Sequence, residues 1–267
     1  MNLFIAQMVS LITNYNDYIK TGNIPKNYLE GGVFDHCETV GFILIRNFVT
    51  RSHLNGDLVG ANPVRWFKYL EKDGCLRLSL HFDSQRGKEN ASEKMSSYIN
   101  GTLYIEAVYK SYSNFWHCLW HKQREPSTEP QWNIRYYLPF RFENTFNSTV
   151  NFTTAAEQLR IVLNKCMQFT MDNDFLQWSQ TCSIAIKVLE STEPEMIFKK
   201  SGVINDRHPL NVRRITYSTL VAFMPPDESL WNIQYKKGED RAMLEKLRDE
   251  FYEALINGLM AAVNLPA

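Results

Sequence analysis

Histidine, arginine and glutamate recur between residues 77 and 135 at spacings that could build a ligand site. Six polar side chains are the candidates: His81, His117, His121, Arg77, Arg135 and Glu106. An arginine fork suits a carboxylate or a phosphate, so the group could bind a small anionic molecule. Imidazole nitrogens also bind transition metals and move protons near neutral pH, so a metal site or a phosphodiesterase chemistry is an alternative.

The positions of these side chains depend on strands, because the surrounding residues alternate between apolar and polar with a period of two. In "CLRLSLHFDS" every second residue from Leu76 to Phe82 is apolar, and the intervening positions carry Arg77 and His81. The same alternation is found in 98–110 and 132–142. Such alternation is typical of antiparallel strands with one buried and one solvated face. All six candidates fall on the face predicted to be polar, where ordinary solvation would also explain them.

The stretch 115–121, "FWHCLWH", allows two interpretations. As a helix it would place His117 and His121 one turn apart, like a pair of metal ligands. As a strand it would add one more member to the alternating segments on either side. Its short length, its aromatic content and its neighbours favour the strand.

Helices are predicted at both ends of the chain and after residue 150. An amphipathic stripe predicts one from about residue 4 to 19, and Asn62-Pro63 predicts a capped helix that ends at Gly74. "TAAE" from Thr154 has the pattern of a capping box, and a further helix follows Asp174. The last predicted helix runs from about 239 to 263. The segment 37–54 could be either strand or helix.

A C-terminal hairpin is predicted because "RRITYSTLVAF", residues 213–223, alternates and is followed by the turn "PPDES" and by 230–236. "DRHP", residues 206–209, is predicted to be a turn, since proline blocks a helix there. The resulting fold class is α+β: an antiparallel sheet, made of a meander of about four strands plus a C-terminal hairpin, is covered by N-terminal, central and C-terminal helices. We expect one domain over 1–267, with a sub-boundary near 143–152.

Composition limits the classes of partner. The chain has 29 basic and 29 acidic residues, so it has no net field to attract nucleic acid, and nucleic-acid binding is not expected. Its five cysteines form no CxxC pair, which is typical of reduced thiols in a cytoplasmic protein. No stretch reaches the roughly 18 apolar residues of a membrane span, and no signal peptide is predicted.

Common catalytic motifs are missing from the sequence: there is no GxGxxG, GxxxxGK[ST], HExxH or GxSxG. The leading hypothesis is therefore a ligand- or partner-binding protein without a cofactor, with a homodimer through the apolar C-terminal helix as one form of partnership. The alternative is a His-dependent, metal-assisted phosphodiesterase or nuclease that uses the polar sheet face. Whether the chain is an enzyme stays open.

Overall fold

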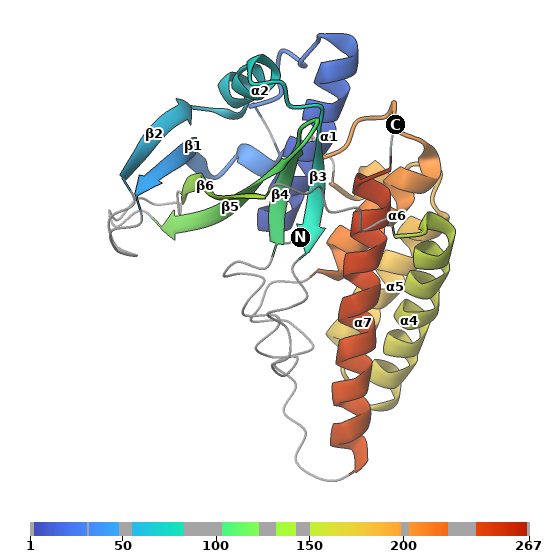
Figure 1. Cartoon of the computed structure of the whole chain (residues 1–267). Coiled ribbons are helices and arrows are strands. Elements are labelled where there is room, and N and C mark those ends of the chain that lie inside the picture. The colour runs from blue at the N-terminus through green and yellow to red at the C-terminus, as the bar shows by residue number, and fades with distance from the viewer. Residues whose placement is uncertain are drawn as a thin grey trace.

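The computed structural model of the chain describes residues 3–30, 32–47, 55–82, 103–122, 132–142, 150–198, 203–223 and 239–265 (Figure 1). Within these residues no helix combines the length and the apolar character that a membrane span requires.

Six strands form one mixed sheet. They are β1 (Cys37–Asn47), β2 (Asn55–Gly60), β3 (Arg77–Phe82), β4 (Leu103–Val108), β5 (Ser113–Lys122) and β6 (Trp132–Phe142). Their order is β2-β1-β6-β5-β4-β3, and every neighbouring pair is antiparallel except β1 and β6, which run parallel. The α+β class is confirmed, and the four predicted strands form an antiparallel meander. The prediction of a purely antiparallel sheet is wrong, because β1 joins the meander in parallel and brings β2 with it.

Six α-helices are present in the described residues. They are α1 (Leu3–Thr21), α2 (Pro63–Lys72), α4 (Phe152–Asp172), α5 (Leu176–Glu190), α6 (Leu210–Ala222) and α7 (Glu239–Val263), with short 3₁₀ turns η1 (Gly32–Phe34) and η3 (Pro194–Phe198). In Figure 1, α1 and α2 lie with the sheet, and α4 to α7 pack against one another beside it. The three predicted helices at 4–19, 63–73 and 239–263 are all present.

The predicted C-terminal hairpin is wrong in its first arm, because residues 210–222 form helix α6. Eight residues of α6 are buried, among them Val212, Ile215, Tyr217 and Leu220, so the helix is covered on several sides. The sequence of a helix that is buried on several sides has no one-sided apolar stripe. Its β-branched residues then give a pattern like that of a strand. The second predicted arm, 230–236, lies outside the described residues.

The helix starts show which local signals decide a boundary. Asn62 caps α2 by accepting a hydrogen bond from the Arg65 amide at 2.9 Å, as the sequence predicts. In α4 the cap is Asn151, whose Oδ1 accepts from the Thr154 amide at 3.0 Å. The predicted cap at Thr154 is therefore wrong by three residues.

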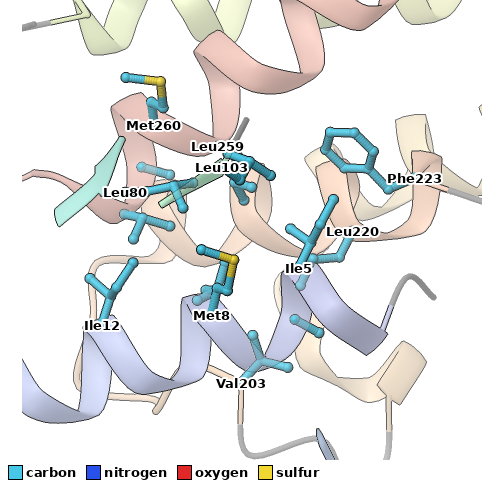
Figure 2. Close-up of a cluster of buried hydrophobic side chains, with 14 of the residues drawn as sticks. Ile5, Met8, Ile12, Leu80, Leu103, Val203, Leu220, Phe223, Leu259 and Met260 are labelled. Carbon is cyan, nitrogen blue, oxygen red and sulfur yellow. The ribbon is translucent and has the colours of Figure 1, made fainter. Parts of the chain in front are cut away.

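A buried apolar cluster joins the sheet to the helices, and α1 lies at the junction. In Figure 2, Met8 and Ile12 of α1 face Leu80 of β3, and Ile5 lies beside Leu220 of α6. Leu103 of β4, Leu259 and Met260 of α7, and Val203 and Phe223 belong to the same cluster. The hydrophobic core is thus continuous from the first helix to the last.

The apolar end of α7 is buried within the chain's own core. From Phe251 to Val263 most side chains are buried, and Gly258 of α7 faces Leu159 of α4 and Ile215 and Thr219 of α6. The apolar surface on which the homodimer hypothesis rested is therefore already covered. The homodimer itself stays a prediction, as does the single domain over 1–267 with a sub-boundary near 143–152.

Two asparagine side chains occupy the outer edge of β3, the last strand of the sheet. The Asn16 amide accepts from Leu78 N and donates to Leu78 O, both at 2.8 Å. The Asn264 amide accepts from Leu80 N at 2.6 Å and donates to Leu80 O at 2.8 Å. Each asparagine imitates one residue of a neighbouring strand, so this part of the edge is closed to further pairing.

Candidate functional site

The structure brings part of the predicted histidine group together on one face of the sheet. His81 of β3 pairs with Tyr104 of β4, and His117 of β5 pairs with Tyr137 of β6. The Tyr104 ring lies between the histidines, with its centroid 6.5 Å from His81 and 5.7 Å from His117. These four side chains form a row across four strands, which we call the histidine row.

The histidine row keeps its two imidazoles a strand apart. Strands β3 and β5 are next-nearest neighbours, so their backbones are separated by about 10 Å. Tyr104 fills the interval between His81 and His117. The His81 ring also lies edge-on to Phe115 of β5, with 4.9 Å between the ring centroids, so aromatic rings separate the two imidazoles.

The other predicted site residues are spread along the same face. Glu106 is 3% exposed and accepts a hydrogen bond from Ser113 Oγ at 2.7 Å. Arg135 is exposed on β6, opposite Leu119 of β5. His121 pairs with Asn133 of β6, but its side chain lies outside the described residues.

This face is less exposed than the sequence predicts. Ser79, Phe115 and Tyr137 on it are almost fully buried, as Glu106 is. Alternation shows that two faces differ, but it does not show that the more polar face meets water. No group of three His, Cys, Asp or Glu side chains close enough to hold a metal is found in the part of the chain that the structure describes.

Arg77 belongs to a different place, a cleft of about 680 Å³ beside the outer edge of β3, which we call the edge cleft. Its volume is in the range of small-molecule sites. Its walls come from four stretches of chain: residues within 13–20 of α1, Leu76 and Arg77, residues 207–209 and 212 at the start of α6, and 262–265 at the end of α7.

The edge cleft carries net positive charge. Lys20, Arg77 and Arg207 line it, against the single acid Asp17. In the described residues no ion pair joins Arg77 or Arg207 to an acidic side chain. The Arg77 guanidinium donates one hydrogen bond, to Ser79 Oγ at 3.1 Å, which leaves further N–H groups to bind an anion.

His208 is a buried polar side chain in the wall of the edge cleft. Its side chain is 9% exposed, and its Nε2 lies 3.4 Å from Asp17 Oδ2 without forming a hydrogen bond within the described part. Asp17 Oδ2 accepts its hydrogen bond from Asn205 Nδ2. The carboxylate of α1 thus faces Asn205 and His208 and holds this segment against the helix.

The start of α6 adds a partial positive charge to the same wall. Pro209, the N-cap of α6, lines the cleft and supplies no capping side chain, while the Val212 amide of the first turn donates to Asn211 Oδ1 at 3.0 Å. The helix dipole favours an anion at this end of α6. Thr13 Oγ1 donates to Val203 O at 3.0 Å and fixes the segment before the helix on α1.

Sequence reasoning found Arg77 but missed the rest of the edge cleft. Arg207 and His208 fall in "DRHP", which was predicted to be only a turn, and Lys20 ends a helix where basic residues are ordinary. The one local signal was His208-Pro209 directly before an apolar segment. It indicates a chain reversal and says nothing of what lies opposite.

Comparison of the chain with protein-family models, with curated proteins and with solved structures found no match. The geometry of the histidine row and of the edge cleft is therefore the basis for inferring a function.

Proposed function

We propose that this chain is a ligand-binding protein of the cytoplasm and that its ligand is a small anion held in the edge cleft. The observation that carries the proposal is the joint presence of Arg77, Arg207 and Lys20 in a cleft with one acidic side chain. A carboxylate or phosphate would accept hydrogen bonds from the arginines and lie near the positive end of the α6 dipole. The cytoplasmic location is supported by the cysteines, all five of which are described and unpaired.

The test is a calorimetric titration with inorganic phosphate at constant ionic strength. Hydrogen bonds to a charged partner contribute about 1.5–3 kcal/mol, so Arg207→Ala and Arg77→Ala should each weaken phosphate binding by about tenfold or more. Arg65→Ala is the matched control, because Arg65 is an exposed arginine of α2 outside the cleft. The affinity of the Arg65→Ala variant for phosphate should stay within a factor of two of that of the parent chain.

Two results would contradict the proposal. One is that phosphate produces no binding heat and no thermal stabilisation of the parent chain. The other is that Arg65→Ala weakens binding as much as Arg207→Ala, because the interaction would then be with the surface charge as a whole.

A second candidate function is a phosphodiesterase or nuclease that uses the histidine row. It is favoured by the alignment of His81, Tyr104 and His117 in adjacent strands. It is weakened by the distance between the two strands that carry the imidazoles, since a general acid and a general base must both reach the reacting phosphate. Cleavage of a generic phosphodiester that His81→Ala and His117→Ala each abolish, and that Arg207→Ala leaves unchanged, would establish it over the first proposal.

A further inference from the structure

The edge cleft has an apolar wall as well as a cationic one. The apolar residues that line it are Ile19, Leu76, Val212, Ala262, Val263 and Leu265. Leu76 is 58% exposed and Leu265 is 38% exposed. A single exposed leucine needs no explanation, but these two border the same small concave site.

Three of the six apolar residues come from segments that also supply charges, and the other three come from the end of α7. Leu76 directly precedes Arg77, and Ile19 directly precedes Lys20. Val212 lies in the first turn of α6, four positions after His208. A bound molecule that placed an anionic group against the arginines would therefore have apolar side chains beside the remainder of its structure.

A fully polar ion would leave this second half of the cleft unused. Inorganic phosphate could satisfy Arg77 and Arg207, but it would cover none of Leu76 or Leu265. Burying apolar surface is a further source of affinity that only a ligand with an apolar part can draw on. Small-molecule sites commonly combine an apolar lining with a few placed polar groups, as this one does.

We infer that the ligand of the edge cleft is an amphipathic anion, with one carboxylate or phosphate group and a short apolar body. The inference rests on the proposed function, because it places the anionic group on the cations of the same cleft. The apolar body would lie along Leu76, Val212 and Leu265.

The experiment is a calorimetric series with acetate, butanoate, hexanoate and octanoate, with octyl phosphate and octanol alongside and inorganic phosphate as the reference. Each added methylene that reaches the apolar wall should strengthen binding by about two- to fourfold. Octanol, which has no charge, should bind at least tenfold more weakly than octanoate. Tighter binding of octanoate would assign a carboxylate head and tighter binding of octyl phosphate a phosphate head, and both support the inference.

A matched pair of variants isolates the apolar wall. Leu76→Ser should weaken octanoate binding severalfold and leave phosphate binding unchanged. Leu58→Ser is the control, because Leu58 is 60% exposed on β2 and does not line the cleft. Circular dichroism of both variants would show whether each is folded.

The failure of the inference can be told from the failure of the proposed function. Equal affinities for acetate and octanoate, with phosphate still bound through Arg207, would overturn the amphipathic ligand and leave the small-anion site standing. Octanol binding as tightly as octanoate would likewise overturn the amphipathic anion without touching the phosphate result. Absence of binding by both phosphate and octanoate would overturn the two proposals together.

Discussion

Replacing Asn264 by alanine should destabilise the fold although the residue lies just after the last helix, α7. Its side-chain amide makes two hydrogen bonds with the backbone of Leu80, at 2.6 and 2.8 Å. Leu80 is 1% exposed, so its N–H and C=O groups would have no ready access to water once the amide is gone. Each unpaired buried group costs about 1–3 kcal/mol, and partial rehydration reduces the sum, so we expect a loss of about 3 kcal/mol.

The measurement is urea unfolding followed by far-UV circular dichroism, with a thermal melt in parallel. For a chain of this size 1 kcal/mol corresponds to roughly 2–4 °C, so Tm should fall by about 6–12 °C. Asn16→Ala removes the equivalent pair of bonds to Leu78 and should have a similar effect. Asn164→Ala is the control, because Asn164 is exposed on α4 and should change stability by less than about 0.5 kcal/mol.

Asn264→Asp adds a pH dependence that alanine lacks. The carboxylate would still accept from Leu80 N, but its other oxygen would face Leu80 O, which raises the pKa of that carboxyl in the folded state. A raised folded pKa means that the destabilisation is smallest below the unfolded aspartate pKa of about 3.9 and grows as the pH rises through the folded value. Two results would contradict this expectation. One is an unfolding free energy of Asn264→Ala within about 0.5 kcal/mol of the parent chain. The other is a destabilisation by Asn264→Asp that is the same at pH 3.5 and at pH 7.

Two further predictions concern the core and the thiols. Gly258→Ala should stabilise the fold by up to about 1 kcal/mol, because a Cβ there would meet Leu159 at 3.4 Å, near ordinary contact, and alanine favours a helix over glycine. Gly258→Leu should destabilise the fold by about 1–3 kcal/mol, because the larger side chain overpacks the core. Equal melting temperatures for the two variants would contradict the tight packing around this position. Burial, opposed in part by a hydrogen bond from Gln7 and reinforced by the charge of Asp35, raises the pKa of the Cys37 thiol to about 11. At pH 8, iodoacetamide should therefore modify Cys37 about a hundredfold more slowly than a free cysteine, with a rate that rises tenfold per pH unit, and a plateau between pH 8 and 9 would contradict this.

The strands and helices that the sequence predicted best are those in which one pattern dominates. The segment 77–82 alternates strictly, and the helix from 63 to 72 has both a cap and a proline at its start. In 210–222 two patterns competed, because burial on several sides removed the amphipathic stripe that would have marked a helix. Strand β2, "NGDLVG", carries two glycines and an aspartate, and only its pairing with β1 makes it a strand.

The candidate site was predictable only in part, for a related reason. Alternation placed His81, Tyr104 and His117 on one face, and the register of three strands then aligned them. The edge cleft joins residues that are more than 200 positions apart, such as Asp17 and Leu265. Such proximity follows from tertiary packing of α1, α6 and α7, and no local spacing contains it.

Amide chemical shifts of the labelled protein during a phosphate titration would test the edge cleft most directly. The cleft predicts saturable shifts for Arg77 and for Arg207, His208 and the first turn of α6, with little change at Tyr104 and His117. Shifts confined to the histidine row, or no saturable shift in 207–212, would contradict it.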